Sequence, residues 1–194
     1  MTIRDYLVCS DLHHGPQGDR ANDETPGWEL VWGLMPEPKL RAGDMDELWQ
    51  FTAKEIGHLI GTDVAGNHDE ANCKVQEVRC GDTIFLHGHQ FDPWNSGPLK
   101  FVGKWITGLA VFLERRLHRD IDLWVARRLK RGRGGDADAY AHKAAAYAAA
   151  RGATQIVFGH LHQRFKVTID GVRVVCTGCC CNGNMDFVTV EVDE

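Results

Sequence analysis

The stretch Gln155-Ile156-Val157-Phe158-Gly159-His160-Leu161-His162 decides the fold that we predict for this chain. Four residues typical of a buried strand are followed at once by a glycine and two histidines, a pattern that predicts a strand whose carboxyl end opens into a site. Four other short stretches carry the same kinds of side chain, mostly after a similar strand-like run: Asp11-Leu12-His13, Gly43-Asp44-Met45-Asp46-Glu47, Gly66-Asn67-His68-Asp69 and His87-Gly88-His89. Carboxylates, an amide oxygen and imidazoles suit Mn, Zn or Fe, held as a pair bridged by one carboxylate. The sequence therefore predicts a metal centre at the ends of several strands.

The order of strands and helices predicts an α/β fold with layered mixed β-sheets and helices outside. Short β-branched runs predict strands over 3–9, 39–42, 62–66, 75–79, 82–87, 155–159, 164–169, 172–177 and 186–192. Helical periodicity or alanine content indicates helices over 28–35, 47–60, 99–131 and 138–151. Asp170-Gly171 is typical of a two-residue hairpin turn. Strands and helices alternate early and hairpins dominate late, so the sheets should be mixed.

Chain length and charge narrow the possible domain organisation and the possible partners. With 194 residues, the chain is long enough for one full domain, and we expect a single domain over 1–194. The net charge of −5 disfavours a stable nucleic-acid complex, but residues 99–133 carry ten Lys or Arg against three Asp or Glu. That local charge of +7 leaves −12 for the rest, which indicates an anionic partner for this segment, with an anionic membrane surface contacted through 99–131 as one possibility. The oligomeric state cannot be predicted.

Cysteine usage and hydropathy indicate the compartment. The first residues do not form a signal peptide, and the longest uncharged apolar stretch, 105–113, is too short to span a bilayer. Seven cysteines, three of them adjacent at 179–181, are not typical of a secreted disulfide framework. We expect a cytoplasmic protein, with peripheral contact at the inner membrane surface as an open alternative. Cys176 and Cys179 to Cys181 are interpreted as a reduced thiol cluster, with a zinc site as the less favoured alternative.

The five stretches together resemble the calcineurin-like metallophosphoesterases. That family's pattern is D-x-H, then GD-x-x-D/E, GNH-D/E, a lone histidine after a strand, and GH-x-H, and all five blocks occur in order between residues 11 and 162. The resemblance implies a four-layer α/β/β/α sandwich. It also implies a dinuclear-metal-dependent phosphoesterase that hydrolyses a phosphodiester, phosphomonoester or pyrophosphate by attack of a metal-bridging hydroxide.

The resemblance also implies a role for each residue. Its metal ligands would be Asp11, His13 and His162 for the first ion, Asn67, His87 and His160 for the second, and Asp44 as the bridge. The cofactors would be two divalent ions, Mn, Zn, Fe or Ni, with Mn as the first choice. His68 would act at the leaving-group oxygen of the phosphate ester, and Asp69 would orient it. Glu47 would accept hydrogen bonds behind the ligands.

Within the family, several features resemble the UDP-2,3-diacylglucosamine pyrophosphatase-like branch. These are the glutamate of GD-x-x-E, the HGH-x-F-D run over 87–92 and a basic helical segment before GH-x-H, so that residues 93–135 would form a helical cap-like insertion. A UDP-sugar lipid pyrophosphate is then the expected substrate. Departures, such as His68 in place of an arginine, leave open a nucleotide or nucleic-acid phosphodiesterase of the same family and a non-catalytic scaffold with the same fold.

Overall fold

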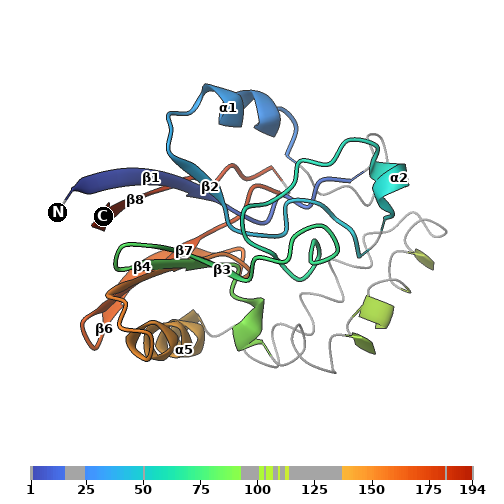
Figure 1. The fold of residues 1–194 in the computed structure, drawn as a ribbon. Helices are drawn as coiled ribbons and strands as arrows, with labels where there is room; N and C mark the ends of the chain where they lie inside the picture. The colour runs from blue at the N-terminus through green and yellow to red at the C-terminus, as the bar shows by residue number, and fades with distance from the viewer. Residues whose placement is uncertain are drawn as a thin grey trace.

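The strands form two facing mixed sheets in the computed structural model, which describes residues 2–15, 25–49, 51–92, 101–102, 104–106, 109, 112–113, 137–181 and 183–193 (Figure 1). The smaller sheet has the order β2-β1-β8 and is built from β1 (Ile3–Cys9), β2 (Lys39–Arg41) and β8 (Val188–Asp193). The larger sheet has the order β3-β4-β5-β7-β6 and is built from β3 (Glu77–Cys80), β4 (Thr83–Leu86), β5 (Gln155–Phe158), β6 (Arg164–Ile169) and β7 (Val172–Thr177).

Strand direction explains where the sheets can carry a site. β1 runs parallel to β2, and β4, β5 and β7 run parallel to one another, whereas β8, β3 and β6 pair antiparallel to their neighbours. The carboxyl ends of the parallel strands therefore lie along one edge of each sheet, and loops from that edge meet there. Asp170 and Gly171 both have positive φ, 48° and 83°, as the predicted two-residue turn between β6 and β7 requires.

One apolar cluster of the described residues fills the space between the sheets. Val8 and Val190 from the smaller sheet and Phe85 and Val157 from the larger belong to the same buried cluster. Tyr6 and Phe85 place their ring centroids 5.7 Å apart across this layer. Burial of this many aliphatic and aromatic side chains is the main favourable term holding the two sheets together.

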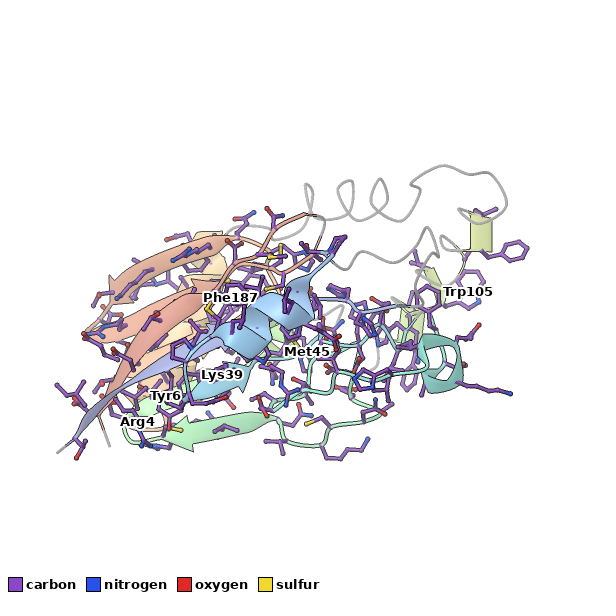
Figure 2. The ribbon with its side chains drawn as sticks, turned by 90° about the horizontal axis from the view of Figure 1, so that it is seen from above. Arg4, Tyr6, Lys39, Met45, Trp105 and Phe187 are labelled. Atoms are coloured by element: carbon purple, nitrogen blue, oxygen red, sulfur yellow. The ribbon has the colours of Figure 1, made fainter. Side chains whose placement is uncertain are left out.

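Helices cover the outer faces of both sheets. α1 (Trp28–Leu34) lies over the smaller sheet, and Figure 2 shows it crossing β1 and β2 from above, near Met45 and Phe187. α5 (Ala137–Ala149) covers the larger sheet (Figure 1) and buries Ala141, Ala144 and Ala148 against it, because small side chains allow close packing. The order helix, sheet, sheet, helix confirms the predicted fold class.

Two local predictions are wrong. Residues 47–60 do not form an amphipathic helix: within them α2 (Ala53–Ile56) is a single turn, which begins at a Thr52/Glu55 capping box. Gly57 at φ 82° and Gly61 at φ 72° end regular structure there. Residues 62–66 do not form a strand, because Asp63 and Val64 donate their backbone N–H groups to the Arg41 carbonyl rather than to a ladder. A short 3₁₀ turn, η1 (His89–Phe91), follows β4.

The basic segment lies mostly outside the described residues. Within 99–131 only short helical pieces at 101–102, 104–106, 109 and 112–113 are described, so the predicted cap over 93–135 is not tested. No helix among the described residues is long and apolar enough to cross a membrane.

Candidate metal centre

The seven candidate ligands come from five loops at the carboxyl ends of strands or near them. Asp11 and His13 follow β1, Asp44 follows β2, His87 follows β4, and His160 and His162 follow β5. Asn67 comes from the irregular segment between α2 and β3. Residues up to 151 positions apart in the sequence thus reach one edge of the sandwich. The arrangement is the one that parallel strand ends favour for a binding site.

The ligand atoms form three overlapping groups. Within each group the atoms lie within 4.8 Å of one another, and the groups are Asp11, His13 and His162; Asp44, His87 and His160; and His13, Asp44 and His68. His87 Nε2 lies 3.0 Å from Asp44 Oδ2 and 4.0 Å from Asp11 Oδ1, so it stands between the two carboxylates. The third group shares His13 with the first and Asp44 with the second, so the three groups form one continuous cluster of N and O donors.

Three buried ligand atoms at this centre make no hydrogen bond within the described part of the chain. They are Asp11 Oδ1, His13 Nε2 and Asn67 Oδ1, and all three residues are at least nine-tenths buried. Leaving a buried polar atom without a partner costs about 1–3 kcal/mol, so native proteins rarely do so without a reason. Two oxygens and an imidazole nitrogen are the donors that first-row divalent cations accept. The donor set present therefore fits a divalent metal ion.

The backbone at the centre is strained in a way that fits a site. Among the described residues, only six non-glycine residues have positive φ, and one of them is Asp170 of the hairpin. The other five, with φ between 51° and 68°, are candidate ligands: Asp11, His13, Asp44, His160 and His162. The left-handed region is unfavourable for residues that carry a side chain, and such strain concentrates at functional sites. This observation does not depend on the sequence motifs.

Hydrogen bonds fix the side of each ligand that faces away from the centre. Asp11 Oδ2 accepts from Ser10 Oγ and, at 2.9 Å, from the backbone N–H of His160, which leaves Oδ1 facing the other donors. His87 Nδ1 donates to the Ala42 carbonyl at 3.0 Å, which leaves Nε2 free to face Asp44. Such outer contacts set the tautomer and orientation of metal-binding histidines.

Glu47 holds two histidines with one carboxylate. Its Oε2 lies 2.8 Å from His13 Nδ1 and its Oε1 lies 2.6 Å from His68 Nδ1. The same Oε1 also accepts the backbone N–H of Trp49 at 3.2 Å, and the Trp49 ring stacks on His68 with centroids 4.4 Å apart. Each imidazole consequently turns its Nε2 atom away from Glu47 and toward the centre.

The role predicted for Asp69 is not supported. Its Oδ1 accepts the Gly66 N–H at 2.6 Å and its Oδ2 accepts the Met45 N–H at 2.9 Å. Both oxygens are therefore committed to the backbone, and the contact that orients His68 comes from Glu47. Asp69 ties the GNHD loop to the loop after β2, a structural role that the motif alone could not reveal.

Glycines in the motifs allow the loops to approach closely. A methyl group on Gly66 would collide with the Asp44 carboxylate, and one on Gly159 would collide with Ser10 and Asp11. These contacts explain why glycine precedes the ligands in GNH and GH-x-H. Packing distance, rather than backbone conformation, requires glycine at both positions.

Electrostatics at the centre favour charged carboxylates and protonated imidazoles. Burial opposes the charge on Asp44, but His87 and His68 outweigh it and hold the pKa of Asp44 well below its usual range. Burial alone would lower the pKa of His13, but the Glu47 hydrogen bond and charge raise it to about 10. The charges of Asp44 and Asp11 likewise overcome burial and raise the pKa of His87 to about 9. Metal binding would require displacing these protons.

Two further histidines, His14 and His89, lie near the candidate ligands and differ in kind. His14 is structural, since its Nε2 atom lies 3.0 Å from the His58 carbonyl oxygen. His89 lies close behind the centre: its ring centroid is 5.6 Å from that of His87, and its Nε2 atom lies 3.3 Å from Glu70 Oε1. His89 therefore lines the surroundings of the centre, and it is absent from the groups of converging donors.

Sequence reasoning assigned no role to Asp92. Its Oδ2 lies 3.4 Å from His160 Nε2. A carboxylate at this place sets the orientation of the imidazole. The HGH-x-F-D run contained the signal, but spacing alone gave no reason to pair Asp92 with a histidine 68 positions away.

Comparisons with known proteins support the fold. No protein-family model matches this chain, and no curated protein matches its sequence. A single-mutant form of Vps29 from Entamoeba histolytica matches with a TM-score of 0.51 and 15% identity, over 98% of this chain and 87% of that one. A conserved uncharacterised protein from Streptococcus pneumoniae TIGR4, described as a predicted phosphoesterase, gives 0.48 and 16%, over 100% and 85%. Phosphopantetheinyl hydrolase from Mycobacterium tuberculosis gives 0.39 and 17%, over 90% and 89%. At these identities the Vps29 match establishes a similarity of fold alone.

Proposed function

We propose that this protein is a phosphoester hydrolase that uses two divalent metal ions. The observation that carries the proposal is that metal-ligating atoms from separate loops converge, Asp11 with His13 and His162 and Asp44 with His87 and His160, and that five of these six residues hold left-handed backbone conformations. Asp11, His13 and His162 would hold one ion, Asn67, His87 and His160 the other, and Asp44 would bridge them. The site binds a cation pair better than it binds protons alone, because each buried atom that makes no hydrogen bond gains a partner.

The ions would supply Lewis-acid activation of water and neutralisation of charge on the phosphoryl oxygens. The side chains of this chain supply the rest. The His68 side chain is 15% accessible, and its Nε2 atom lies 4.0 Å from Asp44 Oδ2. Glu47 accepts at Nδ1, so a proton can be held at Nε2 and donated to the leaving-group oxygen.

An apolar hollow beside His68 indicates what the leaving group carries. A cavity of about 470 Å³ is lined by Trp49, Phe101, Lys104, Trp105 and Leu109. Trp49 belongs to this cavity and also stacks on the His68 ring, so it joins the hollow to the proposed proton donor. Figure 2 shows Trp105 at the end of the molecule away from Arg4. A phosphoester with a bulky apolar group on its leaving-group side fits this arrangement, and the predicted UDP-sugar lipid pyrophosphate is one such compound.

Metal-dependent turnover tests the proposal. Purified protein should cleave bis(p-nitrophenyl) phosphate with Mn²⁺, lose the activity in EDTA and regain it on addition of Mn²⁺, and metal analysis should find two ions per chain. His68→Ala should keep the metal content and lose most of the turnover. Stoichiometric metal binding with no turnover on any phosphoester would favour the scaffold alternative, and absence of metal binding would refute the proposal.

A substrate panel separates the candidate classes. Apolar and aryl phosphoesters, nucleotide-sugar lipids, cyclic nucleotides and single-stranded DNA should be compared at matched concentrations. We expect apolar compounds to have the higher kcat/KM, because the hollow removes their surface from water. Equal kcat/KM for nucleotides and apolar esters would contradict the assignment of the hollow.

Contact of residues 99–131 with an anionic membrane stays a prediction. The charge of the segment motivates it, and liposome flotation with anionic lipid tests it. Reversing the charges of Arg115, Arg116, Arg127 and Arg128 should abolish flotation. Flotation that does not change would rule out this contact.

A further inference from the structure

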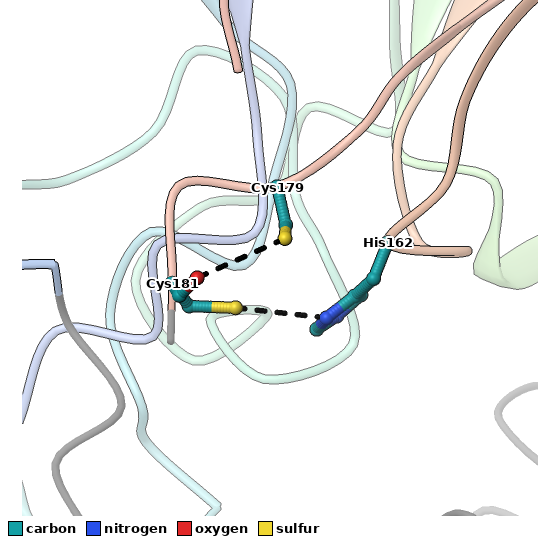
Figure 3. A group of neighbouring side chains, drawn as sticks. All are labelled: His162, Cys179 and Cys181. Carbon is teal, nitrogen blue, oxygen red and sulfur yellow. Dashed lines mark hydrogen bonds between the residues drawn. The ribbon is translucent and has the colours of Figure 1, made fainter. Parts of the chain in front are cut away.

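A second cluster of metal-ligating atoms lies next to the candidate metal centre and contains sulfur. Cys179, Cys181 and His162 come from the loops after β7 and β5, and their Sγ and ring nitrogen atoms all lie within 4.8 Å of one another (Figure 3). Both cysteines are buried, with Cys179 4% and Cys181 0% exposed. The Cys181 Sγ atom lies 3.6 Å from His162 Nδ1.

The loop geometry places these two sulfurs together and excludes the one between them. Cys180 belongs to a separate apolar cluster with Cys9 and Trp28, and its Sγ donates to the Asp186 carbonyl. Cys179 and Cys181 therefore share one side of the loop, and Cys180 takes the other. Asp186 Oδ2 accepts the Cys179 backbone N–H at 3.2 Å, which fixes the loop.

The distance between Cys181 Sγ and His162 Nδ1 matches that of a tetrahedral thiolate–imidazole site. With a Zn–S distance of about 2.3 Å and a Zn–N distance of about 2.0 Å, a sulfur and a nitrogen on one tetrahedral ion are about 3.5 Å apart. The observed 3.6 Å between Cys181 Sγ and His162 Nδ1 agrees with this separation. Asn184 Nδ2 lies 3.7 Å from Cys179 Sγ and donates to it, a contact that stabilises a thiolate.

The two nitrogens of His162 face different surroundings. Nε2 lies 3.3 Å from Asp11 Oδ1, at the candidate metal centre, whereas Nδ1 faces the thiols. The donors on the two sides differ in kind: the Asp11 side offers oxygen and the cysteine side offers sulfur. Soft thiolates select Zn²⁺, Cd²⁺ or Cu⁺, whereas oxygen-rich sites suit harder ions such as Mn²⁺.

We propose that Cys179, Cys181 and His162 Nδ1 form a site for a thiophilic cation, separate from the candidate dinuclear centre and joined to it through His162. The three protein ligands leave a fourth position for water or a small anion. Binding releases the two thiol protons to solvent, together with the Nδ1 proton of His162 when its Nε2 atom already holds an ion, and forms two metal–sulfur bonds and one metal–nitrogen bond, with no change of oxidation state. Because the two sites share one imidazole, a soft cation at the thiols weakens binding of a hard cation on the Asp11 side.

Titration with Cd²⁺ tests the site without any measurement of turnover. Fully reduced protein, loaded with Mn²⁺, should show sulfur-to-metal charge-transfer absorption that saturates at one Cd²⁺ per chain. Cys179→Ser and Cys181→Ser should each weaken this binding more than about tenfold, since even a partner outside the ligand set can cost that much, and the double variant should lose the absorption. The matched control is Cys73→Ser, which changes a half-buried cysteine outside the cluster and should leave the titration unchanged.

Two further measurements keep the test decisive. If a cysteine variant does not fold, the ¹¹³Cd NMR shift of the wild-type protein reports directly whether two sulfurs and a nitrogen bind the ion. Asp11→Asn should weaken Mn²⁺ binding but keep the Cd²⁺ absorption, so failure of the hydrolase proposal and failure of this site give different results. Absence of a sulfur-bound Cd²⁺ signal in the wild type, or its retention in the folded double variant, would overturn the inference.

Discussion

Replacing Glu47 with glutamine should damage the candidate centre although it leaves every proposed metal ligand in place. The Glu47 carboxylate is almost completely buried, at 2% exposed, and each oxygen serves a different imidazole. Oε2 lies 2.8 Å from His13 Nδ1 and Oε1 lies 2.6 Å from His68 Nδ1. A carboxylate can accept from both rings at once, and it adds charge to both hydrogen bonds.

Glutamine cannot satisfy both rings. It offers one carbonyl oxygen and one amide group, so one of the two imidazoles faces a donor instead of an acceptor. If that ring is His13, its proton moves from Nδ1 to Nε2, the atom that would bind metal. If the ring is His68, it loses the contact that orients it. Loss of such an outer contact costs about 10–100-fold in metal affinity or activity, which corresponds to about 1.4–2.8 kcal/mol.

Metal titration and turnover together measure the effect. Glu47→Gln should lower Mn²⁺ affinity or kcat by about 10–100-fold with folding intact by circular dichroism. The control is Glu37→Gln, because the Glu37 side chain is 73% exposed and its carboxylate pairs with Lys39. If Glu47→Gln binds Mn²⁺ and turns over as the wild type does, the bidentate role of Glu47 is wrong.

Four further outcomes are expected. Asp44→Asn should lower metal content and turnover together, and metal analysis showing two ions would refute the bridge. Gly66→Ala should reduce metal affinity, measured by titration, because its methyl group would strike the Asp44 carboxylate. Trp49→Ala should raise KM for aryl and apolar esters several-fold more than for small ones, since a buried aromatic contact contributes about 0.5–1.5 kcal/mol. In EDTA, the pKa of His13 in the folded protein is about 10, above its value in the unfolded chain. The protonated His13 ring therefore stabilises the fold fully below pH ~6.5, and this stabilisation is lost as pH rises through about 10. Urea unfolding at several pH values checks this trend, which saturating Mn²⁺ should reverse because its ligands must be deprotonated.

Most of the fold could be predicted because the strands that build it are buried and short. The β5 and β7 segments are buried at nearly every residue, and the β6–β7 turn has the Asp-Gly pair that its backbone requires. These are local signals: side-chain burial and turn conformation act within a few residues. The way that strands pair across the chain, such as β1 with β8, is not local, and the sequence analysis did not predict it.

The failures share a physical cause, which is that tertiary contacts override local periodicity. The sequence over 47–60 has helical periodicity. However, the Glu47 side chain is buried against His13 and His68, so this residue cannot begin a helix on the surface. Asp69 follows a histidine in the sequence, which suggested that it orients that ring. Backbone N–H groups from Gly66 and Met45 compete for its oxygens and win, because both are buried and would otherwise lack a partner.

The candidate ligand residues could be predicted from the sequence, but their strained backbone conformations could not. Motif spacing says only that a residue follows a strand, whereas the left-handed φ of Asp11, Asp44 and His160 shows that the chain turns sharply to present the side chain. Such conformations cost about 1–3 kcal/mol each in related cases. A fold that carries several such strained residues at one edge must gain compensating free energy elsewhere in the structure or when a ligand binds. If the two ions are bound there, they return part of that free energy to the folded state by mass action. Metal-free protein should then be measurably less stable than the loaded form, and equal unfolding midpoints with and without Mn²⁺ would leave the strain without this explanation.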